Sequence, residues 1–385
     1  MAHYNTVLSQ ILKMIPRHEF EKLANTVDGK VRSTALSRWS QFTALAVGQL
    51  NGRQSLRDIE SCLSSQQHLH YHLGVQSVSK SALARANEQR DAMFYTKLFE
   101  VLYQRCTRYA PRHGFHFKHK LFSLDGSILN ASMKLFPWAD YNRKKAAFKL
   151  HIGLDHDGLI PCFAQITEGR ISENEQARLF NAPKGSVLVF DKGYNNYRWH
   201  KALTDKGIYW VTRIRGNAKY KVLERRDASD NPAITSDQII KYSSTQRDSE
   251  QLHPIRRIGY RDPETNQRYV FITNHFEWSA QTIADIYKQR WQVELFFKWI
   301  KQNLKIKTFL GNSKNAVLTQ VLAALCIYLL IAFMKFQSKM TLSMQQISRL
   351  LQTNLFSKRE LYSLFEKIKR EKDPPPQLKL ALARR

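Results

Sequence analysis

The 385-residue sequence has few cysteines, no cysteine pair at metal-binding spacing and no secretory signal pattern. Its four cysteines stand far apart, at Cys62, Cys106, Cys162 and Cys326. Without a Cys-x-x-Cys pair, neither a zinc site nor a disulfide framework is indicated, and a reducing compartment is expected. The opening stretch, MAHYNTVLSQILKMIPRHEF, lacks the cleavable apolar core of a signal peptide. We therefore expect a cytoplasmic protein.

Long apolar runs are also scarce, and one stretch, residues 316–334, is nearly long enough to cross a bilayer. Thr319 and Gln320 interrupt it, and the flanking sequence is polar and basic. A helix that is apolar on nearly every side is typical of the core of a larger protein. We expect a buried core helix and no membrane partner. A basic, membrane-associated protein built around this segment is the alternative.

Acidic residues are outnumbered: 60 Lys and Arg face 32 Asp and Glu, which gives a formal net charge of +28. This imbalance predicts a polyanionic partner, nucleic acid first and an anionic membrane surface second. The basic residues are spread along the chain and interleaved with aromatic residues. We therefore expect a folded basic protein and not a disordered polycation.

The apolar spacing divides the chain into segments of different secondary structure. Residues 1–105 have helical spacing, and we expect an all-helical, DNA-binding N-terminal domain. Strand-like runs follow in 118–215 and predict a mixed α/β sheet. A β-rich insertion is expected over 216–275, and the core resumes over 276–340. Residues 341–385 are expected to form a basic C-terminal helix and tail.

Within the helical domain, the segment Ser77–Arg90 could be the second helix of a helix-turn-helix. Lys80, Arg85 and Arg90 would then face DNA. A plain helical bundle is equally compatible with the same spacing.

Two acids follow apolar runs that we predict to be strands: Asp125 in FSLDGS and Asp191 in VLVFDKGY. Either one alone could cap a turn. Adjacent strands could also bring both carboxylates to one edge of a sheet, where they would repel each other. A divalent cation relieves such repulsion and prefers hard oxygen ligands.

A third acid lies in YKQRWQVELFFKWIK, residues 287–301, which we predict to be a helix because it lacks Gly and Pro. At roughly 100° per residue, four polar residues share a stripe about 60° wide. They are Tyr287, Arg290, Glu294 and Lys301. A solvated charged stripe is one interpretation. The other is that Glu294 joins Asp125 and Asp191 to hold two Mg²⁺ ions, the arrangement suited to in-line displacement at phosphorus.

The spacing Tyr287-x2-Arg290-x3-Glu294-x6-Lys301 resembles the Y-R-E-K signature of DDE transposases of bacterial insertion sequence family four. The resemblance extends to LDGS at Asp125, to FDKGY at Asp191 and to WVTRIRGN after it. With the β-rich insertion before the glutamate, it covers roughly residues 118–335. The N-terminal region also resembles the helical DNA-binding domain that precedes the catalytic core in one subgroup.

This resemblance implies an RNase H-like core that uses two Mg²⁺ ions, with Mn²⁺ as a substitute. Asp125, Asp191 and Glu294 would be the catalytic metal ligands, and Tyr287, Arg290 and Lys301 would contact DNA phosphates. It further implies cut-and-paste transposition through a hairpin intermediate. The partners would be double-stranded transposon ends and target DNA, bound by a homodimer in the cytoplasm at the nucleoid.

Other candidate DNA contacts are less well defined. The resemblance implies an aromatic side chain that stacks on a flipped base at the hairpin. Tyr269, Trp278 and Trp291 are the candidates. Lys149 and His151 lie on one face of a predicted strand and could also contact DNA.

Two further readings of the same residues remain open. A catalytically inactive DNA-binding protein derived from a transposase would keep the basic surface. A stand-alone RNase H-like nuclease would share the metal site without strand transfer.

Overall fold

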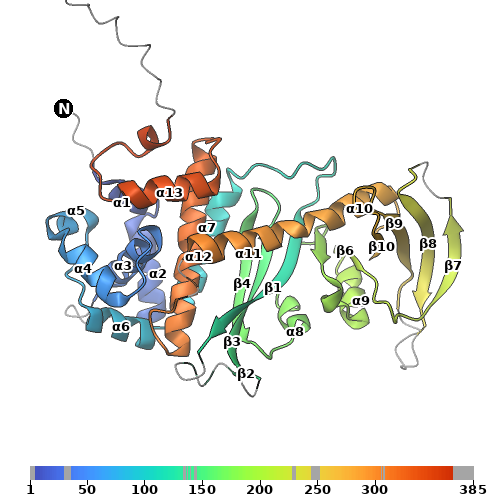
Figure 1. Cartoon of the computed structure of the whole chain (residues 1–385), viewed down its shortest axis with the longest axis horizontal. Coiled ribbons are helices and arrows are strands. Elements are labelled where there is room, and N and C mark those ends of the chain that lie inside the picture. Colours follow the sequence, from blue (N-terminus) through green and yellow to red (C-terminus); the bar gives the residue numbers. More distant parts are fainter. Residues whose placement is uncertain are drawn as a thin grey trace, which may run out of the picture.

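A computed structural model of the chain describes residues 5–29, 36–132, 136, 138, 140–142, 145–227, 231–243, 252–304, 306 and 308–366. Helices gather at one end of the molecule, and a long sheet fills the rest (Figure 1). The first part of the chain is helical throughout. Its elements are α1 Val7–Leu12, α2 Arg17–Asp28, α3 Arg38–Leu50, α4 Leu56–Ser64, η1 Gln67–Leu69, α5 His70–Leu73, α6 Lys80–Gln89 and α7 Met93–Thr107.

Helix α12 (Lys314–Gln337) stands between these helices and the sheet (Figure 1). Among the described residues it is the one helix long and apolar enough to cross a membrane, and 89% of its most apolar window is buried inside the protein. It packs against α3, α6 and α7 on one side and strand β4 (Ile160–Glu168) on the other. The prediction of a buried core helix over this segment is therefore confirmed.

Gln320, one of the two polar residues that interrupt the apolar run of α12, is hydrogen-bonded inside the protein. The side chain of Gln320 is 1% exposed. Its Oε1 accepts a hydrogen bond from the Leu310 amide at 2.7 Å, and its Nε2 donates to the Thr308 carbonyl at 2.8 Å. Because both ends of the amide are paired, a buried glutamine is tolerated in an otherwise apolar helix.

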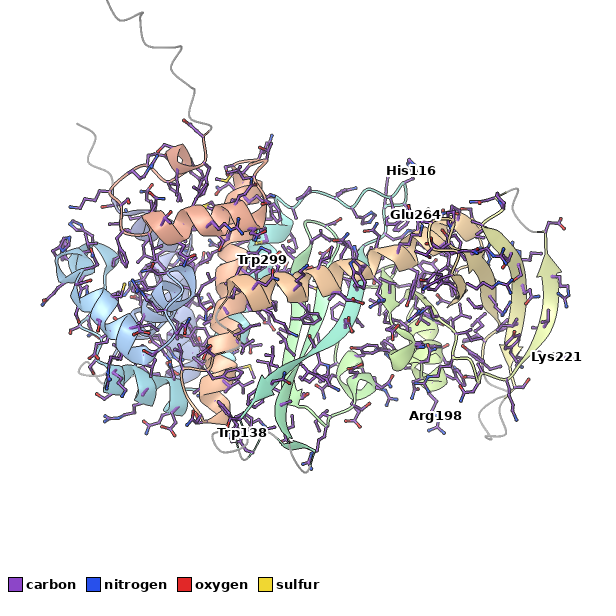
Figure 2. All side chains as sticks on the ribbon, viewed as in Figure 1. His116, Trp138, Arg198, Lys221, Glu264 and Trp299 are labelled. Atoms are coloured by element: carbon purple, nitrogen blue, oxygen red, sulfur yellow. The ribbon has the colours of Figure 1, made fainter. Side chains whose placement is uncertain are left out.

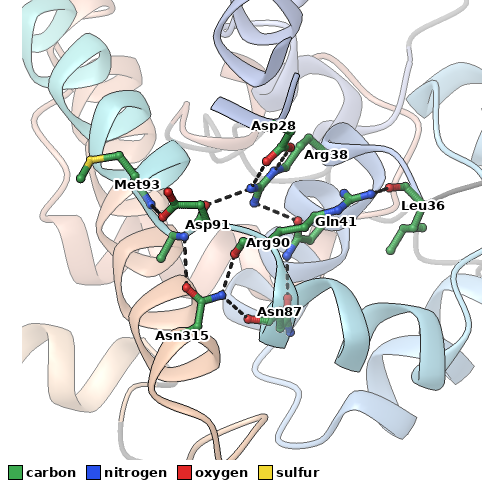
Figure 3. Close-up of polar contacts among 10 residues, drawn as sticks. Asp28, Leu36, Arg38, Gln41, Asn87, Arg90, Asp91, Met93 and Asn315 are labelled. Carbon is green, nitrogen blue, oxygen red and sulfur yellow. Dashed lines mark hydrogen bonds and ion pairs between the residues drawn. The ribbon is translucent and has the colours of Figure 1, made fainter. Parts of the chain in front are cut away.

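A polar network fixes the start of α12 to the turn between α6 and α7 (Figure 3). Asn315 donates to the carbonyls of Asn87 (2.9 Å) and Arg90 (2.6 Å) and accepts from the Ala92 amide at 3.2 Å. The Arg90 side chain turns inward and donates to the carbonyl of Leu36. The prediction that Arg90 faces DNA is therefore wrong, whereas Lys80 and Arg85 are exposed.

Ten strands form one continuous sheet with the order β2-β3-β1-β5-β6-β10-β9-β8-β7, and β4 pairs with β3. The strands besides β4 are β1 Leu121–Ala131, β2 Asp140–Asn142, β3 Lys145–Asp155, β5 Val187–Phe190, β6 Tyr209–Arg213, β7 Tyr220–Arg226, β8 Ile234–Tyr242, β9 Ile255–Arg261 and β10 Arg268–Thr273. Strand β1 is antiparallel to β3 and parallel to β5, which is parallel to β6. The order β4-β3-β1-β5-β6 with these directions is the RNase H-like arrangement that the resemblance implied.

The predicted β-rich segment extends this sheet. Strand β10 pairs antiparallel with β6, and β9, β8 and β7 follow outward. The strand-like runs KYKVLER, HPIRRIGYRD and QRYVFITN of the sequence correspond to β7, β9 and β10. The sequence does not indicate β8, whose run ITSDQIIKY mixes polar and apolar residues without regular alternation.

Helices cover both faces of the sheet. Helices α10 (Ala280–Gln289) and α11 (Trp291–Asn303) lie end to end along one face, and α8 (Glu173–Ala177) and α9 (Tyr197–Asp205) lie on the other (Figure 1). Leu121 of β1 packs into the cluster that contains α10, whereas Phe122 and Leu124 pack into the cluster of α8 and α9. This alternation of side chains assigns each residue of β1 to one face.

The run LFSKRELYSLFEKIKREKD, residues 355–373, predicts a short basic helix, but its described part does not form an α-helix. After α13 (Met344–Asn354), residues 355–366 form turns and the short 3₁₀ helix η4 (Tyr362–Leu364). Lys358 forms a β-bridge with Thr6, and the Val7 amide donates to the Ser357 carbonyl at 3.1 Å. Pairing with the N-terminal segment replaces helical hydrogen bonding here. The predicted tail beyond 366 lies outside the described residues.

The burial of α12 gives a stability prediction. Leu329 is 0% exposed, whereas Leu295, also on a helix, is 43% exposed. Leu329→Ala is expected to lower the free energy of unfolding in urea by about 2–5 kcal/mol because it removes buried methyl groups and leaves a cavity. The matched change Leu295→Ala should cost less than about 1 kcal/mol. Equal losses from the two variants would contradict the central packing of α12.

Candidate active site

The two aspartates lie side by side because of how β1 pairs with β5. The last pair of the parallel register joins Leu124 to Phe190, so Asp125 is the next residue of β1 and Asp191 is the first residue after β5. Both follow the alternation that places their side chains on the face covered by α10 and α11. Strand β1 does not end at Asp125, as the sequence suggested. It continues to Ala131 because β3 stays paired with it, Asp125 lying opposite Ile152.

The predicted stripe of α10 and α11 faces this edge of the sheet. Arg290 Nη2 donates to Glu294 Oε1 at 2.6 Å, and its Nη1 lies 3.6 Å from Asp125 Oδ2. The Tyr287 hydroxyl donates to Asp191 Oδ1 at 3.3 Å. The structure therefore brings these five side chains into one polar cluster.

Lys301, about two turns beyond Glu294, contacts β1. Its Nζ donates to Ser127 Oγ at 2.6 Å and to the Ile128 carbonyl at 3.0 Å. The stripe is not one uninterrupted helix. The Arg290 amide donates to the Tyr287 carbonyl, and the Val293 amide donates to the Arg290 carbonyl. This i→i−3 pattern separates α10 from α11.

Burial, together with the nearby carboxylates of Glu173 and Glu294, raises the pKa of Asp125 to about 6, although the Gly126 amide and Arg290 oppose this rise. The Gly126 amide donates to Asp125 Oδ1 at 2.8 Å. A carboxyl whose charge is disfavoured in this way gains from a nearby cation.

Asp191 has the opposite balance. Burial would raise the pKa of Asp191, but the hydrogen bond from Arg213, at 2.9 Å, the Lys192 amide and Arg290 lower it below its ordinary value. Arg213 lies at the end of β6, next to β5 in the sheet. Sequence reasoning missed this arginine, although it stands in the quoted motif WVTRIRGN.

The family resemblance implies divalent cations, and the donor chemistry fits them: three carboxylates supply hard oxygen ligands from β1, the end of β5 and α11. In the arrangement described here, positive charge comes from Arg290, which bridges Asp125 and Glu294, and from Arg213 on Asp191. Within the described residues, no three acidic, histidine or cysteine side chains lie close enough to hold an ion as drawn. Arg290 and Arg213 thus contact the oxygens that a cation would bind.

The side chains of Lys149 and His151 point into the protein and not towards solvent. His151 is 3% exposed, its Nε2 lies 2.9 Å from Thr167 Oγ1, and its Nδ1 has no hydrogen-bond partner. Lys149 Nζ lies 3.4 Å from Glu173 Oε1 and donates to the Ile171 carbonyl at 3.3 Å. The prediction for His151 is incompatible with its burial, and Lys149 turns towards an acid on α8.

An aromatic pocket of about 290 Å³ opens beside the cluster. Tyr260, Tyr269, Phe271 and Tyr287 line it together with Arg290, and Trp291, 55% exposed, stands on its border. Trp278 does not line this pocket. Its ring stacks on His275 and on Phe117, with ring centroids 3.7 Å and 4.5 Å apart. Of the three candidates for base stacking, Trp278 is therefore occupied by packing, and Tyr269 and Trp291 share one pocket.

Basic side chains also project far from the pocket. Figure 2 shows Arg198 of α9 and Lys221 of β7 directed outward, and both are exposed. Trp299, in contrast, lies where α11 meets α12 and contacts Tyr328 edge-on at 5.0 Å (Figure 2). This packing ties the helix that carries Glu294 to the central helix.

Comparison with known proteins gives consistent matches. Residues 116–330 match the transposase DDE domain family, and residues 3–76 match a domain of unknown function. A putative transposase y4zB of Sinorhizobium fredii is 30% identical over 303 residues, which cover 78% of this chain and 82% of that protein. A probable transposase for insertion sequence element IS5377 of Geobacillus stearothermophilus is 30% identical over 246 residues, 63% of this chain and 64% of that protein.

Among solved structures, a piggyBac transposase synaptic complex with hairpin DNA overlaps 98% of this chain and 83% of its own, with a TM-score of 0.45 and 14% identity. At that score, the overlap does not bear on the function of this chain.

The raised pKa of Asp125 predicts a pH-dependent stability difference. Ionisation costs stability as the pH rises from about 4 to about 6, because the folded-state pKa lies above the unfolded one. Asp125→Asn removes this cost. The variant is expected to gain about 1–2 kcal/mol of unfolding free energy at pH 7.5 and nothing at pH 4. Asp227→Asn, at an exposed position, should change neither value. An equal gain at both pH values would contradict the assignment.

Proposed function

Because this chain belongs to the DDE transposases of bacterial insertion sequences, which act on DNA with divalent metal ions, we propose that Asp125, Asp191 and Glu294 are its catalytic carboxylates. The observation that carries the proposal is that two neighbouring strands and one helix bring the three acids together around Arg290. Its guanidinium contacts Asp125 and Glu294, and its charge lowers the pKa of Asp191. The chain cuts transposon-end DNA and transfers it to a target.

The three carboxylates would hold two Mg²⁺ ions, with Mn²⁺ able to replace them. Bound there, the cations activate the attacking hydroxyl and stabilise the leaving oxygen of a phosphodiester. The residues around the three carboxylates set their charge and orientation. Burial makes the charge of Asp125 costly. Arg213 helps to lower the pKa of Asp191, and hydrogen bonds from Arg213 and Tyr287 orient its carboxylate.

Arg290 has two tasks in this proposal. Without DNA it balances Asp125 and Glu294. When cations and a DNA backbone enter, the guanidinium turns to the phosphate, whose oxygens it can bind with two parallel hydrogen bonds. Tyr287 and Lys301 are the other phosphate contacts of the family signature. Lys301 also ties α11 to β1 through Ser127, which fixes the distance from Glu294 to Asp125.

The aromatic pocket next to Arg290 suits an unstacked nucleotide. Its walls are Tyr260, Tyr269 and Phe271, and Trp291 stands at its opening. Stacking on such side chains offsets the loss of base stacking in the duplex. We place the flipped base of a hairpin intermediate there, in a cut-and-paste reaction performed by a DNA-bound homodimer in the cytoplasm.

The catalytic role of Glu294 is tested by Glu294→Gln. The variant is expected to bind DNA carrying the element's own ends as wild type does, and to lose Mg²⁺-dependent cleavage by at least about a hundredfold, since a carboxylate ligand is removed. Glu100→Gln, on the exposed face of α7, is the matched control and should cleave normally. Binding is measured by electrophoretic mobility shift, and cleavage by gel analysis of labelled ends.

The other possible results of this binding and cleavage assay would indicate different functions. Wild type that binds ends without cutting them would indicate an inactive DNA-binding protein. Cleavage without joining to a target would indicate a stand-alone nuclease. Normal cleavage by Glu294→Gln would remove Glu294 from the site.

The pocket is tested by Trp291→Ala, with 2-aminopurine placed in turn at each terminal position of the DNA end. Loss of stacking should weaken binding of the cleaved or hairpin end by about 1–3 kcal/mol and lower the fluorescence change of the unstacked base. Tyr71→Ala, at an aromatic side chain 89% exposed on α5, is the control. Unchanged fluorescence at every position in Trp291→Ala would exclude a base in this pocket beside Trp291.

A further inference from the structure

A fourth carboxylate reaches the candidate metal site from the opposite face of the sheet. Glu173 belongs to α8, on the face away from α11. Strand β5 ends at Phe190 while β1 continues, so the sheet is open beside β1 after Leu124. A side chain from the α8 face can approach Asp125 and Asp191 through this opening.

The two glycines of the aspartate motifs make room for Glu173. A Cβ added at Gly126 would lie 3.3 Å from Glu173 Oε1, and one added at Gly193 would lie 3.8 Å from Glu173 Oε2 and 3.9 Å from Asp191 Oδ2. The carboxylate therefore lies between the residue after Asp125 and the turn after Asp191. Asn174 holds α8 there by donating to the Gly193 carbonyl at 3.1 Å.

A second, independent observation concerns His151. Its ring lies opposite Gly126 in the β1–β3 register and is 97% buried, and its Nδ1 lies 3.3 Å from the same Cβ position as Glu173 Oε1. This Nδ1 has no hydrogen-bond partner. Buried polar atoms are normally paired, so an unpaired nitrogen beside the same glycine as Glu173 Oε1 indicates a site that can take a further polar ligand or another position of Glu173.

Lys149 is the cation that now accompanies Glu173, with Nζ 3.4 Å from Oε1. At that distance the contact is loose, and the Glu173 side chain remains 32% exposed. Its carboxylate is thus free to change partner at little cost.

We propose that Glu173 is an additional oxygen ligand for the divalent cations of this site, approaching from the α8 face and positioned by His151. The inference rests on the proposed metal site of Asp125, Asp191 and Glu294. It adds a ligand outside the family signature, so that four carboxylates from both faces of the sheet surround the cations.

The test is direct Mn²⁺ binding to the full chain, followed by the electron paramagnetic resonance signal of free Mn²⁺. Glu173→Gln is expected to weaken Mn²⁺ binding by about tenfold or more. Glu175→Gln makes the same charge change on the same helix at an exposed position and should stay within about twofold of wild type. Circular dichroism melts confirm that each variant is folded.

A second variant separates ligation from long-range charge. Glu173→Asp keeps the charge and withdraws the carboxylate by one methylene, so it should still weaken Mn²⁺ binding by about threefold or more. It also provides the test if Glu173→Gln does not fold.

Asp125→Asn distinguishes failure of the fourth ligand from failure of the whole metal site. If Mn²⁺ binding is lost in Asp125→Asn but unchanged in both Glu173 variants, the inference is overturned and the proposed metal site stands. If wild type binds no Mn²⁺, or Asp125→Asn binds it normally, both are overturned. Weakening in both Glu173 variants but not in Glu175→Gln supports the fourth ligand.

Discussion

The parallel pairing of β1 with β5 is the constraint on which the site depends. Hydrogen bonds that align Leu124 with Phe190 fix Asp125 beside Asp191, and the period of two in a strand turns both side chains to one face. A shift by one residue would turn Asp125 to the other face and leave Asp191 alone. The early end of β5 has a second effect, because it opens the sheet where Glu173 approaches.

The buried helix α12 holds the other component of the site in place. It packs on the N-terminal helices, on β4 and, through Tyr328, on Trp299 and Phe296 of α11. Because α11 carries Glu294, the distance between this acid and the aspartates is set by packing as well as by Lys301. The network around Asn315 links the same helix to α6 and α7, so the helical domain and the catalytic sheet share one core (Figure 3).

Arginine and carboxylate charges are balanced throughout the cluster. Arg290 forms ion pairs with Asp125 and Glu294, and Arg213 forms an ion pair with Asp191. This balance lets three acids stay close together without cations, since each unpaired carboxylate would otherwise be costly at such burial. Arg290 and Arg213 therefore pair with the carboxylate oxygens that a cation would also need.

Local pattern was enough to predict the strands around Asp125 and Asp191, the helix that carries Glu294 and the buried α12, because period and apolar length are properties of short segments. It failed for β8, whose alternation is irregular, and for residues 355–366, where pairing with Thr6 overrides helical propensity. The sequence by itself determined the chemistry: the acids, the Y-R-E-K spacing and the surplus of positive charge. Only the tertiary structure decided which residues meet. It buried His151, packed Trp278 against His275 and Phe117, turned Arg90 inward, and brought Arg213 and Glu173 to the site from distant elements. Such contacts depend on sheet order and helix packing and leave no mark in local spacing.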